Sequence, residues 1–591
     1  MISEKLSRIL INVQRPGRYI AGEWNSVRKE WADGTVKVVL AFPDNYEVGS
    51  SHLGIKILYG MLNERKDCLC ERVFAPWPDF EAALRNSGIL LSSLESQMPL
   101  EDFDILGFSL AYELTYTNMI NMLDLGGVPV RSSERSSADP LVIAGGPASF
   151  NPEPVSDFID AFLIGEGEEA VPEIVECYKA HKTTVHSQQS TDKANRKSLL
   201  RELAAIKGVY VPSLYKVEYG PDGTINNTVP SEDGVPKLVE KRIVRDLDSA
   251  YYPTRQIVPN IQIVHDRIAI EVMRGCKHAC RYCQASATYR PCRERSKETV
   301  VRLAKEAYAS TGYDEISLLS LSSGDYSQIC DVIEALNAEF SGKNVSVSVP
   351  SLRVEDILKD LPALISKVKK SGLTFAPEAG SECLRKAISK NIDIEKLYTA
   401  VSESFKNGWK RVKLYFMIGL PGETDDDILG IAEMARTVSS LKTKLDARPA
   451  QVVLSVNAFV PKPHTIFQWE GMDGMEALKA KRDLLKGSIR SRMIELDFHS
   501  FEMSYIEAAM SRGDRRLGAV IYGAWKEGAR FDGWQEMFNM ERWLGAFKAE
   551  GIDPDFYVTR RKSYDEILPW DHLDLGHKKE AMAREASSCR A

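Results

Sequence analysis

The stretch 268–295 reads IAIEVMRGCKHACRYCQASATYRPCRER and organises the second half of the chain. Its apolar start, residues 268–273, predicts a buried strand. Cys276, Cys280 and Cys283 follow at C-x3-C-x2-C spacing, on a loop just past the end of that strand. Close, loop-borne cysteines are typical ligands of iron–sulfur clusters. Three of them hold three irons of a four-iron cluster, so the fourth iron stays open to a small molecule.

A zinc site is the alternative reading of the same cysteines. Structural zinc takes four ligands, and Cys292 or His278 is available as the fourth. A disulfide framework is not favoured, because ten cysteines in 591 residues are too sparse for one. We interpret Cys292 as a small residue in the turn that follows the motif. With only Cys589 near the C-terminus, we expect no second cysteine-built metal centre there.

Composition restricts the class of protein. The length of 591 residues predicts roughly three or four domains, and 44% hydrophobic with 27% charged residues is ordinary for a globular chain. A net charge of −7 argues against a generally basic nucleic-acid binder. No run of 18 apolar residues and no signal-peptide pattern is present, so we expect a cytoplasmic protein without a membrane partner.

Residues 35–185 alternate strand and helix patterns after a leader at 1–34. Helices are expected at 53–65, 78–85 and 116–125. Strands are expected at 35–42, 70–74, 104–110, 140–144 and 160–164. This alternation predicts an α/β fold with a doubly wound parallel sheet. Ligands of such sheets lie beyond the carboxyl ends of the strands.

Residues 186–260 are interpreted as a linker with a small β extension. The polar run 181–197 has no periodic apolar face, which predicts a linker or an exposed loop. Short strands are expected at 208–212 and 215–219.

Residues 261–490 return to strand–helix alternation. Strands are expected at 268–273, 314–321, 344–349, 372–376, 411–418 and 451–459, with amphipathic helices between them. Six such units predict a partial (β/α)6 barrel whose active site lies at the carboxyl ends of its strands. Residues 491–591 predict a last strand at 495–501 and a mainly helical C-terminal region with helices at 517–529 and 534–548.

The cysteine motif, with Tyr282 before its last cysteine, resembles the radical S-adenosylmethionine (SAM) enzymes. The turns Ser-Ser-Gly-Asp at 322–325 and Gly-Leu-Pro-Gly-Glu at 419–423 stand where that superfamily has strand-end turns, although Ser323 departs from its usual glycine. The resemblance implies a [4Fe-4S] cluster, SAM on its open iron, release of a 5′-deoxyadenosyl radical, and a reducing partner such as flavodoxin or ferredoxin. It also implies SAM contacts at Tyr282, Gly324, Asp325, Ser348, Arg353, Glu378 and Val460.

The N-terminal region resembles the cobalamin-binding domain that precedes many radical SAM barrels, most specifically in the GGP…NPEP…D…GEGE run at 145–168. Cobalamin contacts are implied at Gly54, Gly107, Ser109, Gly145, Gly146, Gly165, Glu166 and Gly167. The D-x-H-x-x-G motif whose histidine ligates cobalt is not matched, so we interpret His52 as a turn or helix-cap residue. The alternative is a degenerate domain that keeps the sheet and binds nothing.

The whole chain thus resembles radical SAM proteins with an N-terminal cobalamin-binding-like domain. Three functions stay open: a cobalamin-dependent methyltransferase acting on an unreactive carbon, a cobalamin-independent radical modification of RNA, protein or a metabolite, and a non-catalytic iron–sulfur redox protein. The substrate and the catalytic residues are not readable, and no basic stripe with interleaved aromatics indicates nucleic acid.

Overall fold

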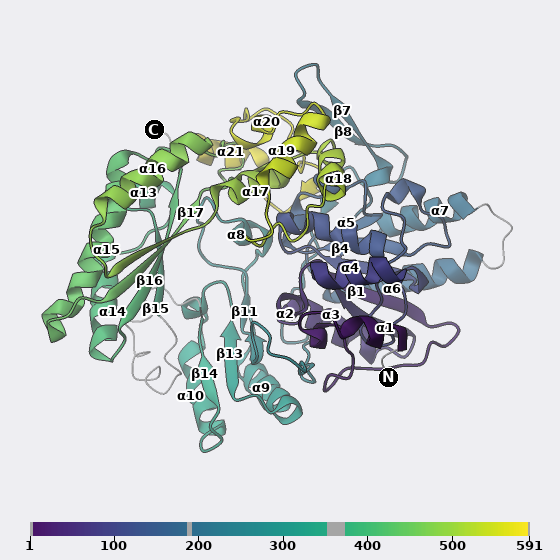
Figure 1. Cartoon of the computed structure of the whole chain (residues 1–591), viewed down its shortest axis with the longest axis horizontal. Helices are drawn as coiled ribbons and strands as arrows, with labels where there is room; N and C mark the ends of the chain where they lie inside the picture. Colours follow the sequence, from purple (N-terminus) through teal and green to yellow (C-terminus); the bar gives the residue numbers. More distant parts are fainter. Residues whose placement is uncertain (1–3, 186–191, 351–372, 589–591) are drawn as a thin grey trace.

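The computed structural model describes residues 4–185, 192–350 and 373–588 (Figure 1). Its N-terminal part is built on a six-stranded sheet of order β2-β1-β3-β4-β5-β6. All neighbours in it are parallel except the last pair. The strands are β1 (Val36–Phe42), β2 (Cys68–Phe74), β3 (Ile105–Ser109), β4 (Leu141–Gly145), β5 (Ala161–Leu163) and β6 (Val209–Tyr210). Their near-continuous burial is that of strands covered on both faces, which confirms the predicted doubly wound sheet.

Helices connect these strands and cover the sheet. They are α3 (Leu53–Glu64), α4 (Pro78–Ser87), α5 (Tyr116–Leu125), α6 (Gly167–Val185) and α7 (Asp192–Ala204). The sheet also takes its sixth strand, β6, from the segment that we interpreted as a linker and small β extension. The extension itself is the antiparallel hairpin of β7 (Tyr215–Tyr219) and β8 (Ile225–Pro230).

The prediction of a loop at 181–197 was wrong at both ends of that run, where α6 and α7 are helical. Polar contacts hold these helix ends in place of an apolar face. Arg196 is buried and donates to Asp160 Oδ2 at 2.7 Å, and His181 Nδ1 lies 3.0 Å from Glu202 Oε1. A reading based on apolar periodicity misses helices of this kind. Residues 186–191 lie outside the described residues.

The second half contains all six of the predicted strands, but in the described residues they form two parallel sheets. The first sheet holds β10 (Ile268–Glu271), β13 (Glu315–Leu319) and β14 (Ser346–Ser348). The second holds β15 (Leu373–Glu378), β16 (Arg411–Ile418), β17 (Gln451–Ala458) and β18 (Ile494–Phe498). The strand expected at 495–501 is β18, and it extends the second sheet. Residues 351–372, between β14 and β15, lie outside the described residues.

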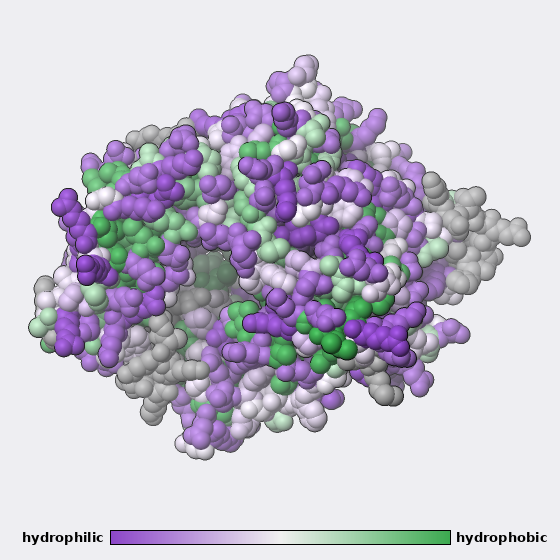
Figure 2. Space-filling model, viewed as in Figure 1, coloured by the Kyte–Doolittle hydropathy of each residue, from purple (hydrophilic) through white to green (hydrophobic). Residues whose placement is uncertain are grey.

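The helices between these strands pack on the outer faces of the two sheets. They are α9 (Lys297–Thr311), α10 (Ile329–Glu339), α13 (Glu382–Ala387), α14 (Ile394–Lys406), α15 (Asp425–Asp446) and α16 (Met475–Ser488). Buried residues of α9 and α10 form one core with β10, β13 and β14, and the second sheet belongs to the main core of the molecule. The two sheets therefore have separate cores. Figure 2 shows a hollow in the face of the molecule between them.

The C-terminal region is mainly helical, as predicted, and packs against the N-terminal part (Figure 1). Its longer helices are α17 (Phe501–Arg512), α18 (Leu517–Lys526), α19 (Met540–Ala549) and α21 (Lys579–Ser588). The helix expected at 534–548 begins only at Met540, because Asn539 caps it by accepting from Arg542 N at 3.2 Å. Trp534 Nε1 instead donates to Asp44 Oδ1 of the N-terminal part at 3.0 Å. Within the described ranges, no helix has the length and apolar character needed to span a membrane.

Candidate functional site

A short antiparallel ladder carries the three motif cysteines. Its strands are β11 (Met273–Arg274) and β12 (Arg293–Glu294), and residues 275–292 between them are called the cluster loop from here on. Gly275 opens the loop with φ +90°, and a Cβ there would lie 2.8 Å from Tyr289 O and 2.9 Å from Cys292 Cα. Only glycine therefore lets the returning chain pass so close to the first cysteine.

All three motif cysteines lie on this loop and are half-buried. Cys283 precedes the short helix α8 (Gln284–Thr288), and its backbone N donates to Cys280 O at 3.1 Å. Burial raises the pKa of the Cys283 thiol, so a bound metal is needed to hold it as a thiolate at neutral pH. In the part of the chain that is described, no three His, Cys, Asp or Glu side chains converge on one metal ion. A four-iron cluster places each thiolate on a separate iron, so this donor set fits it without such convergence.

One side of the cluster loop is fastened to the end of β15. Tyr282 Oη donates to Glu378 Oε1 at 3.0 Å, and Lys390 Nζ lies 3.5 Å from the same oxygen. Glu378 has φ +69° and follows a register shift in the strand, a conformation that is rare for a side-chain-bearing residue. Burial raises the pKa of the Glu378 carboxyl. The structure thus brings together two of the predicted SAM contacts.

The other side of the loop is fastened to the turn after β13. His278 Nε2 lies 2.7 Å from Asp325 Oδ2, and Lys277 Nζ donates to Asp325 O at 2.7 Å. Gly324 and Asp325 belong to a single 3-10 turn, Ser323–Asp325. The sequence reading considered His278 only as a zinc ligand and missed this contact. The position of His278 between the first two cysteines is the one feature of the sequence that could have suggested this contact.

The remaining predicted SAM residues are not brought to the cluster loop by any contact that the structure describes. Ser348 Oγ donates to Glu315 Oε1 at 3.0 Å, and that carboxylate also binds Arg267. Val460 is half-buried against the main core. Arg353 lies outside the described residues. For all seven residues the SAM contact itself stays a prediction.

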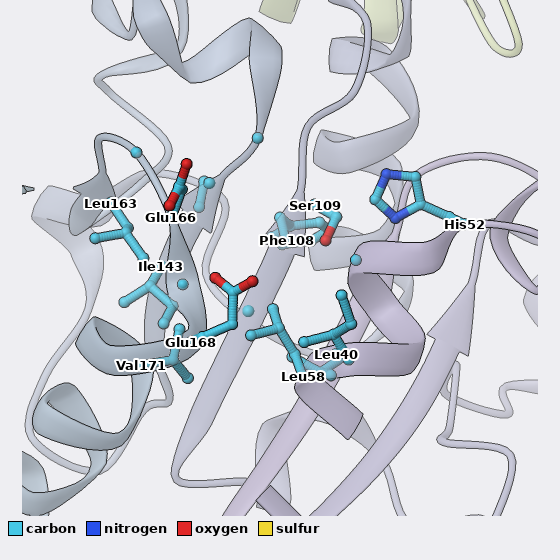
Figure 3. Close-up of a pocket in the computed structure, with 18 of the residues that line it drawn as sticks. Leu40, His52, Leu58, Phe108, Ser109, Ile143, Leu163, Glu166, Glu168 and Val171 are labelled. Atoms are coloured by element: carbon cyan, nitrogen blue, oxygen red, sulfur yellow. The ribbon is translucent and has the colours of Figure 1, made fainter. Parts of the chain in front are cut away.

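A cavity of about 360 Å³ lies at the carboxyl edge of the N-terminal sheet (Figure 3). Its floor is apolar, with Leu40 and Ile143 from the strands facing Leu58 and Val171 from α3 and α6. All eight residues that the sequence suggested as cobalamin contacts line it, namely Gly54, Gly107, Ser109, Gly145, Gly146, Gly165, Glu166 and Gly167. Turns spread over more than a hundred residues therefore form one site.

Two of these glycines are required by the protein's own backbone. Gly146 has φ +108°, and a Cβ there would lie 2.7 Å from Leu110 O. Gly165 has φ +116°, and a Cβ there would lie 2.2 Å from Arg242 O. The fold therefore requires these two glycines whether or not a ligand lies against them. Gly107 differs, because a Cβ there would make only ordinary contacts, at 3.4 Å from Leu40 and 3.7 Å from Ile143.

His52 caps α3, as interpreted from the sequence. Its Nδ1 accepts from Ile55 N at 3.3 Å. The ring also lines the cavity, where burial and the neighbouring Lys56 lower its pKa to about 4. The imidazole is therefore neutral at physiological pH.

Ion pairs join the cavity directly to the two stems of the cluster loop. Glu166 forms a two-pronged pair with Arg293, at 2.7 and 2.8 Å. Arg274 NH2 donates to Glu168 Oε1 at 2.6 Å and to Glu271 Oε2 at 2.8 Å. All five side chains are largely buried. The sequence reading missed Glu168, Glu271, Arg274 and Arg293, although the GEGE turn that supplies two of the carboxylates was singled out.

Comparisons with known proteins give matches over both halves of the chain. Residues 54–212 match the family of radical SAM proteins, N-terminal, and residues 270–435 match the radical SAM superfamily. An uncharacterized protein of Methanocaldococcus jannaschii is 26% identical over 518 residues, 87% of this chain and 97% of that protein. The tRNA-2-methylthio-N(6)-dimethylallyladenosine synthase of Syntrophomonas wolfei is 25% identical over 178 residues, 29% of this chain and 40% of that protein.

Among solved structures, one similar protein is the radical S-adenosylmethionine methyltransferase TsrM of Kitasatospora setae, with cobalamin and a [4Fe-4S] cluster bound. The likeness covers 87% of this chain and 100% of that chain, at 12% identity and a TM-score of 0.49.

Proposed function

The chain belongs to the radical SAM superfamily, and from this premise we propose that it is a cobalamin-dependent methyltransferase acting on an unreactive carbon. The superfamily implies a [4Fe-4S] cluster and SAM as cofactors. Cys276, Cys280 and Cys283 would hold the cluster. When bound, the cluster and SAM supply radical chemistry and cobalamin supplies a transferable methyl group.

The cavity beside the cluster loop is the observation that supports cobalamin. Its volume of about 360 Å³ is within the range of small-molecule sites. Cobalamin as a whole is larger, so we assign the apolar floor between the sheet, α3 and α6 to the flat base of its nucleotide tail. The glycine turns and Ser109 at the mouth would then lie against the corrin edge. The corrin would then face Arg274, just before the cluster loop, and Tyr289 within the loop, which both line the same cavity.

The residues of the chain keep the cluster loop in place from three directions. Tyr282 binds Glu378 at the end of β15, His278 binds Asp325 in the turn after β13, and Arg293 binds Glu166 in the turn after β5. A reactive centre of this kind needs its surrounding groups fixed before the reaction. The loop is thus held by segments at the carboxyl ends of strands from all three sheets.

A specific observation favours a second candidate, a radical SAM enzyme without cobalamin. Glu168 and Glu271 line the cavity and both pair with Arg274, which lines it as well. These pairs alone would allow the N-terminal part to serve as a scaffold for the cluster loop, with no second cofactor.

Anaerobic reconstitution with iron, sulfide and hydroxocobalamin, followed by desalting, separates the two candidates. We expect the wild type to retain about one cobalamin per chain, seen by its visible absorbance. Gly107→Val, which fills the apolar floor, should lose the cobalamin and keep the iron. The control, Gly545→Val, alters a glycine of α19 with open space around it. A wild type that retains no cobalamin yet forms 5′-deoxyadenosine from SAM would establish the second candidate.

A further inference from the structure

A second cavity, of about 310 Å³, lies against the cluster loop. Its wall includes Cys280 and Cys283, and Ala279 beside them is exposed. The opposite wall comes from the turn after β17, with His464, and from the C-terminal segment 576–585. Two of the three proposed cluster ligands therefore face this cavity.

One face of the C-terminal segment lines the cavity. Lys578, Ala581, Met582 and Glu585 all line it, and their spacing of three and four residues places them on one face of a helix. Glu585 Oε1 accepts from Arg281 Nε of the cluster loop at 2.9 Å. The segment is thus fastened to the loop, and its exposed residues surround the approach to the two cysteines.

The charge at this cavity is positive in a chain whose net charge is −7. Arg290 and Lys578 line it, and within the described ranges neither forms an ion pair with a carboxylate. The pair of Arg281 with Glu585 is neutral overall. Three cations and one carboxylate leave a net charge of +2. Arg281 and Arg290 belong to the cluster loop and Lys578 to the C-terminal segment. Cations spread over two segments in this way suit an acidic protein surface better than a small anion.

We propose that this face, the cavity with Arg290, Lys578 and the C-terminal segment, is the docking surface of an acidic one-electron carrier protein of the flavodoxin or ferredoxin type. The inference rests on the proposed function, because reductive cleavage of SAM needs one electron delivered to the cluster. The reduced carrier loses one electron and the oxidised cluster gains it, and no bond forms or breaks in that step. Docking here brings the carrier to the cavity that Cys280 and Cys283 line.

Stopped-flow reduction of the reconstituted enzyme tests this surface, with bleaching of the cluster absorbance as the signal. Two donors are compared: reduced flavodoxin, which must dock, and photoreduced 5-deazariboflavin, which is small and carries no net charge. Lys578→Glu reverses an exposed charge outside the cluster and SAM residues. Lys548→Glu, at the exposed end of α19, is the matched control.

We expect Lys578→Glu to lower the second-order rate constant with flavodoxin about fivefold at low ionic strength, because a charge at the edge of an interface acts mainly on the association rate. The difference should shrink at high salt. Reduction by deazariboflavin and the behaviour of Lys548→Glu should match the wild type. Equal rates of Lys578→Glu and wild type with flavodoxin would overturn the docking surface alone. A cluster that neither donor reduces would overturn the proposed function.

Discussion

Replacing Glu166 by glutamine tests whether the N-terminal part holds the cluster loop in place. Glu166, Arg274 and Arg293 each expose only 9% of their side chains. Breaking a buried ion pair by removing one partner costs about 3–5 kcal/mol, because the other charge is left buried. Glutamine keeps one acceptor for Val244 N, which donates to Glu166 Oε2 at 2.6 Å, so we take the lower value of about 3 kcal/mol.

Hydrogen exchange followed by mass spectrometry measures the loss of local stability in the cluster loop. Local opening of the loop governs exchange of its amides, and about 1.4 kcal/mol corresponds to a factor of ten. Glu166→Gln should therefore speed exchange in peptides covering 275–292 roughly 100-fold. Peptides from β16 and β17, which belong to the main core, should be unchanged.

The control is Glu169→Gln, three residues further along the chain in the first turn of α6. Glu169 is 48% exposed and pairs with Arg242 on the surface at 2.8 Å, so its loss should cost about 0–1 kcal/mol. Equal exchange in the two variants would refute the assignment of Glu166 as a holder of the loop.

Two further predictions concern the ligands of the cluster and the loss of folding stability at acid pH. Cys280→Ala should reduce the iron content after anaerobic reconstitution from about four per chain to near zero. The control, Cys292→Ala, should retain the wild-type iron content. Full iron in Cys280→Ala would disprove the ligand assignment. His464 is buried, its Nε2 donates to Phe150 O at 2.9 Å, and burial lowers its pKa to about 3. The unfolded chain protonates this histidine near pH 6.5 and the folded chain does not, so stability should fall as pH drops below about 6.5, by about 2 kcal/mol at pH 5. Asparagine tolerates the φ of +61° at this position. The melting temperature of His464→Asn should therefore fall less between pH 7 and pH 5 than that of the wild type. An equal fall in the two proteins would contradict this.

Much of the fold follows from local patterns in the sequence. Apolar runs such as the one in β4 predict strands, because a strand covered on both faces of a parallel sheet must bury its side chains wherever its neighbours lie. The run 181–197 is the exception: its helices are held by contacts such as the one from Arg196 to Asp160, and no apolar stripe marks them. The break into two sheets also depends on how the segments pack, and periodicity carries no signal of it.

The candidate site also combines features that the sequence predicts with features that only the tertiary structure shows. The spacing of Cys276, Cys280 and Cys283, and the glycine turns of the N-terminal part, are local features, so the sequence by itself determined the class of cluster and the edge of the sheet at which a ligand would lie. Only the tertiary structure decided which groups hold the cluster loop. Glu166 and Arg293 are 127 residues apart, and His278 and Asp325 are 47 apart. Such pairs form because the carboxyl ends of separate sheets meet at one place, and no pattern within a single segment records that meeting.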